Sequence, residues 1–377
     1  MKELEKTLLE LFLQLHAHPE LGFEERASTA AIREILVREG VEILDSGLET
    51  GLVAQITGAL PGPVIGLRGD IDALPIQEET NLPYASEVPG RMHACGHDAH
   101  AAIMLGAAIL LHRRRDRLRG SVKLVFQPAE ENSYGAQRVL GTGMLDDAAL
   151  FLAVHTYPAF PASVLGIKEG PVMAAVDRFE IHIRGRGSHA AHPHKGVDPV
   201  VVQAAIVLGA QSIVSRALDP FAPVVVSITH ARSGNTWNVI PETAYLEGTV
   251  RTLDPAARAT VRARLDALVQ QTALAYGAEA ELAWHPGPPA VLNDPGLCGE
   301  ARAVARELGF RVDRQEDTLG GEDFSYFLQD RPGIFIRVGS GGDYPSHHPR
   351  FTVDPAAIYP AAEYFAQLAE RLLNKGA

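Results

Sequence analysis

Residues able to bind metal ions gather in the segment MHACGHDAHAA, which contains one of the chain's two cysteines. Cys95 and His97 form a Cys-x-His pair just before a predicted helix, and this spacing lets both side chains reach one cluster. A thiolate is a strong ligand for soft divalent cations and can bridge two of them. Taken alone, a cysteine is more often a small buried hydrophobic residue, but the histidines and aspartate around Cys95 favour a metal site.

Two adjacent carboxylates, Glu130 and Glu131, follow the apolar segment KLVFQPA. Neighbouring buried carboxylates repel each other unless a cation or a proton separates them. One of them can therefore bind a metal ion while the other takes the proton of an attacking water. The alternative is a charged loop exposed to solvent, which is the commoner fate of a Glu-Glu pair, but the position at the end of a strand favours a site.

Other candidate ligands also follow apolar segments. His155 closes the run LFLAV, and His347 and His348 lie in SHHP. Asp70 and Asp72 follow VIGLRG and, two residues apart on an extended chain, point to one face, where they can bind a metal or orient a ligand histidine. A two-metal hydrolytic site needs such a set of ligands, with a bridging group, an open position for water and a nearby base.

These residues require a scaffold that brings the ends of several segments together. In the first half of the chain, apolar runs such as GLVAQI, PVIGLRGDI, SVKLVF and FLAVH alternate with helical patterns. This alternation predicts an α/β fold with a mainly parallel sheet. Open α/β sheets bind ligands beyond the carboxyl ends of their strands, which is where the candidate residues lie.

The middle of the chain shows a different order of elements. Its elements follow the βαββαβ pattern of a ferredoxin-like domain. They are the strand DRFEIHIRG, a helix, the strands APVVVSITHA and TAYLEGTVRTL, a second helix and the strand EAELAWH. The chain length also favours two domains over one. We therefore predict a catalytic metal-binding domain of residues 1–176 and 289–377, and an inserted domain of residues 177–288.

The composition disfavours several other classes of protein. The 377 residues are 46% hydrophobic and 21% charged, which is typical of a globular protein, and the formal net charge of −12 argues against nucleic-acid binding. No apolar stretch approaches the roughly 20 uncharged residues that span a bilayer, so no membrane partner is expected. The charged N-terminal segment differs from a signal peptide, and we expect a cytoplasmic protein in which Cys95 and Cys298 form no disulfide.

Eight segments, in order along nearly the whole chain, together resemble the M20 metallopeptidase family: HPELGFEE, LRGDIDALPIQE, MHACGHDAHAA, QPAEE, GRGSHAAHPHKGVDP, NVIPETAYLEGTVRTLD, GGEDFSYF and HHPRF. They are most similar to the aminoacylase branch, which includes N-acyl-amino-acid amidohydrolases, hippurate hydrolases and auxin-conjugate hydrolases. The resemblance implies two divalent metal ions in the catalytic domain, and an inserted lid domain that also mediates dimerisation.

The resemblance also implies a role for each matching position. Cys95 would be the bridging thiolate, where other family members have an aspartate, and the remaining metal ligands would be His97, Glu131, His155 and His347. The branch usually shows His-x-Pro-x-Phe at the last ligand. Here the ligand position and the variable position that follows it, His348, are both histidine, so the choice between them stays open.

Five further residues are expected to take part in catalysis or substrate binding. Glu130 would be the general base and acid, and Asp72 would support the catalytic site. His189 and Asn238 match positions that reach over the scissile group from the partner subunit in related enzymes. Arg251 resembles an arginine that holds the substrate carboxylate, and its alternative role is an ion pair at a strand edge.

The predicted function is metal-dependent hydrolysis of the amide bond of N-acyl-L-amino acids, such as N-acetyl or N-benzoyl compounds, to a carboxylate and a free amino acid. The metal ions would be Mn, Zn, Co or Ni, since a mixed Cys, His and Glu site accepts each of them. We expect a small-molecule substrate and a homodimer or higher homo-oligomer. The alternatives are an M20 dipeptidase or carboxypeptidase, an N-acetyl-diaminopimelate deacetylase, or a noncatalytic metal-dependent binding protein.

Overall fold

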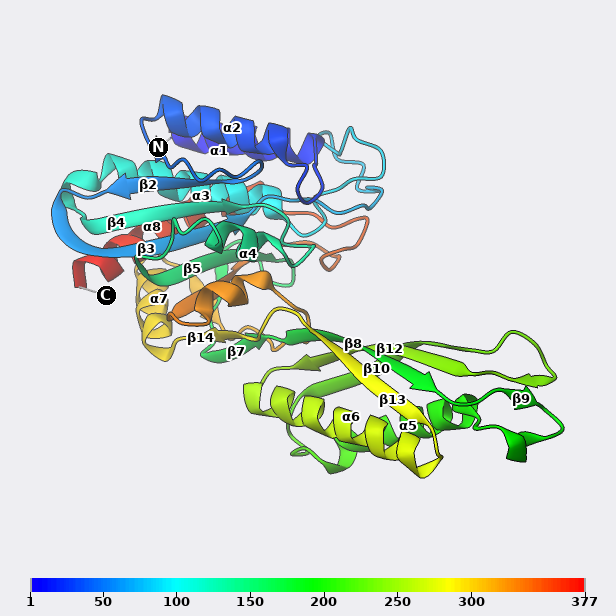
Figure 1. Ribbon diagram of the computed structural model, residues 1–377. Coiled ribbons are helices and arrows are strands. Elements are labelled where there is room, and N and C mark those ends of the chain that lie inside the picture. The colour runs from blue at the N-terminus through cyan, green and yellow to red at the C-terminus, as the bar shows by residue number, and fades with distance from the viewer. Residues whose placement is uncertain (1, 376–377) are drawn as a thin grey trace. The chain divides into compact units, whose positions relative to one another are not determined.

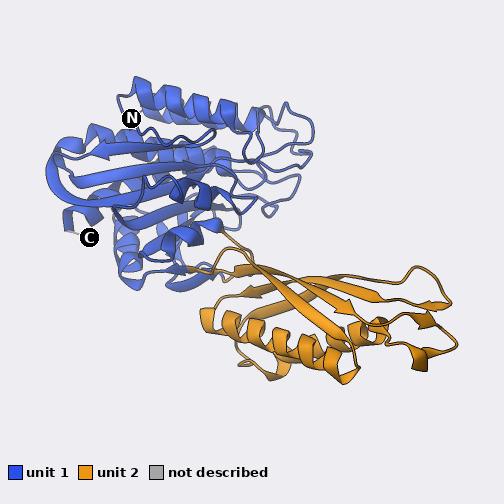
Figure 2. Cartoon of the chain, in the orientation of Figure 1, with its two compact units in different colours: residues 1–172, 292–316, 323–377 blue, residues 173–291, 317–322 orange. Residues whose placement is uncertain are grey.

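The computed structural model describes residues 2–375 of the chain, which form the elements drawn in Figure 1. They divide into two compact units (Figure 2). Unit 1 consists of Met1–Val172, Leu292–Glu316 and Asp323–Ala377, and unit 2 of Met173–Val291 and Asp317–Glu322. The short segment 317–322 thus groups with unit 2, although it was predicted to belong to the catalytic domain. Its Gly321 packs against Val176 of unit 2, because a Cβ added there would lie 2.4 Å from the Val176 side chain.

Unit 1 is built on an eight-stranded sheet with the order β1-β2-β4-β3-β5-β16-β6-β15. The central strands β4, β3, β5 and β16 run parallel, so their carboxyl ends meet at one edge. The strands are β1 (Glu42–Ile43), β2 (Leu52–Thr57), β3 (Leu60–Asp70), β4 (Arg119–Gln127), β5 (Ala148–Tyr157), β6 (Val164–Gly166), β15 (Arg311–Asp313) and β16 (Gly333–Gly339). The predicted α/β fold with a mainly parallel sheet is confirmed.

Helices cover both faces of this sheet. The larger hydrophobic core joins one face to α1 (Lys2–Ala17), α2 (Arg26–Arg38), α3 (His97–Arg113), α7 (Pro295–Glu307) and α8 (Ile358–Lys375). On the other face, buried side chains such as Phe151 pack against the 3-10 segment η3 (Asp323–Leu328), beside the short helix α4 (Gly135–Leu140). Helix α3 is buried almost throughout, because small and aliphatic residues occupy all of its faces. The strands that carry the site residues at their ends therefore pack against a buried helix.

Unit 2 contains a four-stranded antiparallel sheet with the order β10-β12-β8-β13 and two helices. The chain order β8-α5-β10-β12-α6-β13 is the predicted βαββαβ pattern. Its elements are β8 (Ala175–Arg184), α5 (Pro199–Arg216), β10 (Val224–Ser233), β12 (Thr243–Thr252), α6 (Pro255–Ala275) and β13 (Glu279–Pro286), with β9 (Ser188–His189) paired to β11 (Val239–Ile240). The chain leaves unit 1 through β7 (Gly170–Met173) and returns through β14 (Val291–Asn293), and these two strands pair.

Helix α5 is long and apolar enough to cross a membrane, by length and composition alone. The sequence was expected to contain no apolar stretch of this length, and this expectation was too strong. In the structure α5 packs with α6 in the second hydrophobic core, to which it contributes Val202, Ile206 and Ala210. Core helices of globular domains satisfy the same criteria, so α5 is weak evidence for a membrane span.

Candidate metal centre

The candidate residues lie at the edge of unit 1 where the parallel strands end. Asp70 is the last residue of β3, and Asp72 follows it two residues later. Glu130 and Glu131 follow the end of β4 after a short turn, and His155 lies near the end of β5. Because these strands are adjacent and parallel, residues from distant parts of the sequence meet there.

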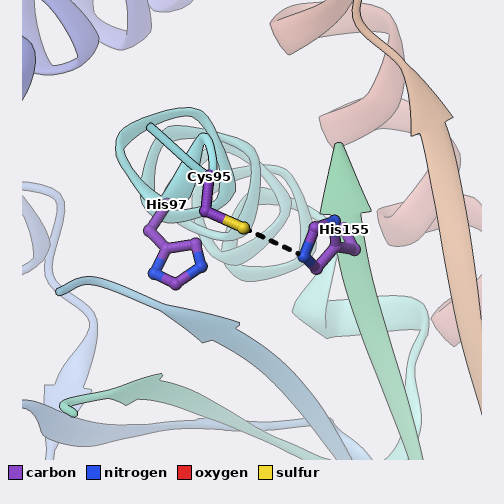
Figure 3. A group of neighbouring side chains, drawn as sticks. All are labelled: Cys95, His97 and His155. Carbon is purple, nitrogen blue, oxygen red and sulfur yellow. Dashed lines mark hydrogen bonds between the residues drawn. The ribbon is translucent and has the colours of Figure 1, made fainter. Parts of the chain in front are cut away.

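Cys95, His97 and His155 form one potential metal-binding group (Figure 3), with ligand atoms that all lie within 4.8 Å of one another. The Cys95 Sγ atom is 3.5 Å from His155 Nε2. His155 Nδ1 donates a hydrogen bond to the backbone oxygen of Thr156 at 2.7 Å. This bond leaves Nε2 of His155 as the nitrogen available to a metal ion.

The backbone at Gly96 explains how Cys95 and His97 reach the end of β5. Gly96 has a φ of 85°, in the left-handed region, and it precedes the first turn of α3. A Cβ at this position would lie 2.4 Å from Thr156 Oγ1, so only glycine allows the close approach. The Thr156 hydroxyl also donates a hydrogen bond to the carbonyl oxygen of Cys95 at 2.9 Å. The Cys-x-His segment is thereby fixed against the strand that carries His155.

A second potential group shares Cys95 with the first and adds Glu131 and His347. His347 Nε2 lies 3.2 Å from Glu131 Oε1, and its backbone amide donates to the carbonyl oxygen of Ala94 at 2.7 Å. The ring of His348 instead stacks on Tyr344 with a centroid distance of 4.3 Å. The structure therefore brings His347 into the cluster and directs His348 away from it.

Asp72 connects the two groups. Its Oδ1 atom is 3.1 Å from His97 Nδ1, and its Oδ2 atom accepts a hydrogen bond from the backbone amide of Glu131 at 3.0 Å. The carboxylate is buried and holds the His97 ring so that Nε2 faces the cluster. Asp72 thus orients one candidate ligand and the backbone of another.

The donor set fits divalent metal ions. His97 Nε2 is buried, and within residues 2–375 it has no hydrogen-bond partner. An unsatisfied buried polar atom costs about 1–3 kcal/mol, and a cation would remove this cost. Burial raises the pKa of the Cys95 thiol to about 12 in the protein without metal, so the thiolate needs a cation beside it. A thiol, imidazoles and a carboxylate suit Zn, Mn, Co and Ni.

The charges around the cluster also favour cations. Burial opposes protonation of His97, but the carboxylate of Asp70 raises the pKa of this imidazole well above its ordinary value. A hydrogen bond to Glu131 likewise raises the pKa of His347. These shifts show that the protein surrounds both imidazoles with negative charge, which would hold a metal ion as it holds a proton.

Glu130 lies beside the cluster. A carboxylate oxygen of Glu130 is within 4.8 Å of the ligand atoms of His97 and Glu131, and the side chain is largely buried. The residue before it, Ala129, has a φ of +52°, a conformation that costs a non-glycine residue about 1–3 kcal/mol. His347 has a φ of +67°. The loops that carry the chemistry are thus held in strained conformations by their surroundings.

A buried ionic network beneath the cluster was not predicted from the sequence. Arg68 donates to Asp70 Oδ2 at 2.7 Å, to Asp323 Oδ1 at 2.9 Å and to Gln127 Oε1 at 2.9 Å. Asp70 in turn bonds Nδ1 of His100, whose Nε2 accepts from the backbone amide of Thr156 at 2.7 Å. The motif LRGDID contains Arg68, but only the fold shows that Asp323, 255 positions later, is its partner.

Among the described residues, those predicted in unit 2 take part in no comparable buried ionic network. His189 in β9 is opposite Val239 in β11, and the amide of Ala190 donates to the carbonyl oxygen of Asn238 at 3.1 Å. His189 is exposed, and its Nδ1 accepts a hydrogen bond from the amide of Ala191 at 3.0 Å. The structure therefore brings His189 and Asn238 together on a surface of unit 2.

Arg251 lies in β12, opposite Val176 of β8. β12 is an interior strand of its sheet, and no carboxylate within residues 2–375 forms an ion pair with Arg251. An ion pair at a strand edge, the alternative role for this residue, is therefore not observed. Burial lowers the pKa of Arg251. An arginine that is partly buried without a counterion is suited to bind an anionic group.

Comparison with known proteins agrees with this geometry. The model of peptidase family M20/M25/M40 matches residues 66–371. The chain is 46% identical over 374 residues to the N-acetylcysteine deacetylase of Bacillus subtilis (strain 168), covering 99% of this chain and 98% of that protein. It is 34% identical over 384 residues to thermostable carboxypeptidase 1 of Saccharolobus solfataricus, covering 100% of this chain and 98% of the relative.

The fold is also similar to a solved structure. The crystal structure of a Bacillus subtilis protein, described as a dinuclear metal binding peptidase from the M20 family, superimposes with a TM-score of 0.91 at 43% identity. The match covers 99% of each chain. The resemblance inferred from eight short segments thus extends over both units.

Proposed function

Because the chain belongs to peptidase family M20/M25/M40 and is a metal-dependent hydrolase of that family, we propose that it deacylates N-acyl-L-amino acids. N-acetyl amino acids, N-acetyl-L-cysteine first among them, are the proposed substrates. The products are a carboxylic acid and a free amino acid.

One observation carries the proposal: two potential metal-binding groups share Cys95 and lie directly beside Glu130. A thiolate shared by two groups suits two ions, held by Cys95 together with His97, Glu131, His155 and His347. The similarity to an N-acetylcysteine deacetylase along the whole chain supports the choice of amide substrate.

The positions of the side chains support a mechanism for this reaction. Two divalent ions, when bound, supply Lewis acidity toward the scissile carbonyl and the attacking water. Glu130 takes the proton of this water and then delivers it to the departing amine. Asp72 keeps His97 in the tautomer that presents Nε2, and it holds the backbone of Glu131. The buried side chains around these groups hold them in one geometry, which reduces reorganisation during the reaction.

Unit 2 is proposed to recognise the substrate. His189 and Asn238 would stabilise the oxyanion and bind the amide from the partner subunit, while Arg251 would bind the carboxylate of the amino acid. Unit 2 exposes large apolar side chains, which supports a homodimer formed through it: Val200, Val201, Leu208, Trp237 and Val239. A Leu208→Glu variant is expected to dissociate the dimer in sedimentation experiments.

A cytoplasmic location is part of the proposal. Cys95 and Cys298 are both free and buried. A cysteine that serves as a metal ligand must remain reduced, and the cytoplasm keeps thiols in that state.

The experiment that tests the function measures release of free amino acid from metal-stripped protein to which Mn, Co, Zn or Ni is returned. The panel contains N-acetyl-L-cysteine, N-acetyl-L-methionine, N-benzoylglycine and dipeptides. We expect metal-dependent release from the N-acyl compounds. Absence of release from every N-acyl compound would contradict the proposal.

The chain offers a matched pair of variants for the same experiment. Cys95→Ser is expected to lose metal and activity. Cys298→Ser should keep both, because Cys298 is buried in the core, where its thiol donates a hydrogen bond to the carbonyl oxygen of Lys168 at 3.5 Å. Equal metal content in the two variants would show that Cys95 is not a ligand.

A carboxypeptidase is the second candidate, since a carboxypeptidase is 34% identical to the chain over its full length. Both reactions use the same metal chemistry and a substrate carboxylate. Faster hydrolysis of the dipeptides than of the N-acetyl amino acids would favour this alternative.

A further inference from the structure

The turn that carries Glu130 and Glu131 is held in a conformation its own sequence disfavours. Ala129 and Ser133 have φ angles of +52° and +59°, which residues with a side chain rarely adopt. The turn itself is closed by the bond from the Ser133 amide to the carbonyl oxygen of Glu130, at 2.7 Å. Contacts from outside the turn must therefore select this conformation.

One such contact comes from a residue more than 100 positions earlier. The Oε1 atom of Glu25 accepts a hydrogen bond from the backbone amide of Ala129 at 2.8 Å. Glu25 is fully buried, and its Oε2 atom has no hydrogen-bond partner within residues 2–375. Glu25 is itself anchored, because its carbonyl oxygen accepts from the amide of Thr29, in the first turn of α2, at 3.0 Å.

The backbone around Glu25 also lies directly against the turn. A Cβ added to Gly22 would be 3.1 Å from Ala129 Cα, so the two backbones touch. The carbonyl oxygen of Glu20 accepts from the amide of Ala73 at 2.8 Å, which ties the segment to the end of β3 beside Asp72. The segment of residues 20–25 therefore joins the two strand ends that carry the catalytic carboxylates.

Two buried carboxylates thus hold the amides on either side of Glu130. Glu25 binds the amide of Ala129, and Asp72 binds the amide of Glu131 at 3.0 Å. Asp72 also contacts His97, and its position at the end of a strand had already indicated that it could orient a ligand histidine. Among the described residues, Glu25 forms no hydrogen bond or ion pair with a candidate ligand, and the sequence assigned no role to it.

The contact does not depend on the charge of Glu25. Burial raises the pKa of Glu25 to about 7, and either ionisation state retains an oxygen that accepts from Ala129. A glutamine at this position would retain the same acceptor without the charge.

We infer that Glu25 is a positioning residue for the proposed general base: its hydrogen bond to Ala129 selects the turn conformation that places the Glu130 carboxylate beside the cluster. The inference rests on the role proposed for Glu130. It assigns to Glu25 an effect on turnover through the turn and no direct contact with the substrate.

The test compares Glu25→Ala, Glu25→Gln and Glu20→Ala in the metal-loaded enzyme with N-acetyl-L-cysteine. Loss of a residue that orients a catalytic group typically costs 10- to 100-fold, and we expect a fall of about this size in kcat for Glu25→Ala, with little change in KM or metal content. Glu25→Gln should keep kcat near that of the unmodified enzyme.

Glu20→Ala is the matched control. Glu20 lies on the same segment and accepts from the amides of Ala27 and Ser28 in the first turn of α2, at 3.0 and 2.8 Å, and among the described residues its side chain forms no hydrogen bond with the turn. Its loss should lower stability and leave kcat unchanged. Equal kcat losses in Glu25→Ala and Glu20→Ala would reduce Glu25 to a general stabiliser of the segment and overturn the inference.

Two further measurements separate the inference from the proposed function. Hydrogen exchange of the amides of residues 129–131 should accelerate in Glu25→Ala and not in Glu20→Ala, whatever reaction the enzyme catalyses. Ala129→Gly, which adopts a positive φ without strain, should restore part of the lost kcat in the Glu25→Ala background. Unchanged hydrogen exchange in Glu25→Ala would refute the positioning role of Glu25. Inactivity of the unmodified enzyme toward all N-acyl substrates would refute only the proposed function.

Discussion

The residues proposed for chemistry and those proposed for recognition differ sharply in how the protein supports them. The metal cluster of unit 1 (Cys95, His97, Glu131, His155 and His347) is backed by buried hydrogen bonds and ion pairs. The side chain of His189 in unit 2 is exposed and accepts a hydrogen bond from the amide of Ala191 in its own loop, and Arg251 has no ion pair among the described residues. The proposed metal ligands therefore all come from one unit of one chain, whereas the proposed recognition residues would need a substrate or a second surface beside them.

Replacing the proposed base should have the largest effect. Glu130→Gln preserves the shape of the side chain and removes the proton acceptor, so kcat should fall by roughly 10²- to 10⁴-fold with both metal ions retained. Metal analysis and steady-state kinetics check this outcome.

Glu131→Gln is the matched comparison, because the two carboxylates are adjacent in the same turn. It should lower the metal content as well as the activity. If Glu130→Gln lost metal and Glu131→Gln kept it, the two roles would have to be exchanged.

His189→Ala should reduce kcat by about 10²-fold if His189 stabilises an oxyanion, a typical cost of removing such a donor. His192→Ala is the control, since His192 lies on the same loop with its ring centroid 5.5 Å from that of His189. An equal effect of the two substitutions would indicate a disturbed loop rather than a role in the reaction.

Mixing variants tests whether His189 acts across a dimer. Glu130→Gln and His189→Ala chains, combined in one mixture, should recover activity that neither has alone, because a mixed dimer contains one intact site. A mixture as inactive as its components would place His189 and Glu130 of the same chain in one site.

Arg251→Ala should mainly raise KM, by about 10-fold or more, since loss of a charged hydrogen bond typically costs 1.5–3 kcal/mol. Arg178→Ala is the control on the same sheet, because Arg178 is already paired with Glu247 at 2.6 Å. A larger KM effect from Arg178→Ala would move the carboxylate site away from Arg251.

The smallest predicted effect concerns the pH dependence of stability in unit 1. Burial opposes a charged His16, but hydrogen bonds to Asp98 and Glu78 raise its pKa to about 10, from an ordinary value of 6.5. The raised pKa in the folded state means that this stabilisation is complete below pH 6.5 and is lost as the pH rises toward 10. The difference in urea midpoint between the unmodified protein and His16→Gln should therefore shrink across this range, and a constant difference would exclude a charged His16.

Much of the fold and part of the site could be predicted from the sequence. Alternating apolar segments indicated the α/β sheet, and the βαββαβ order of unit 2 was visible from strand and helix patterns. Cys95 and His97 were visible as a pair because they are two residues apart, and Glu130 and Glu131 because they are adjacent. Such signals are local, since spacing along one element decides which side chains share a face.

Other features depend on contacts that spacing does not contain. The sequence favoured His347 over His348 as a ligand but left the choice open, and in the structure His347 lies 3.2 Å from Glu131 whereas His348 stacks on Tyr344. The ion pair between Arg68 and Asp323 depends on the packing of η3 against the sheet.

The sequence by itself determined which chemical groups were present, and most of the strands and helices that carry them. Tertiary structure decided which groups meet, because parallel strands bring their carboxyl ends together regardless of separation along the chain. Glu25 shows the difference: it follows another glutamate in a charged segment, yet the fold buries it against the turn of Glu130. The packing of the elements determines this hydrogen bond, which joins residues 104 positions apart. The local sequence around Glu25 or Ala129 does not predict it.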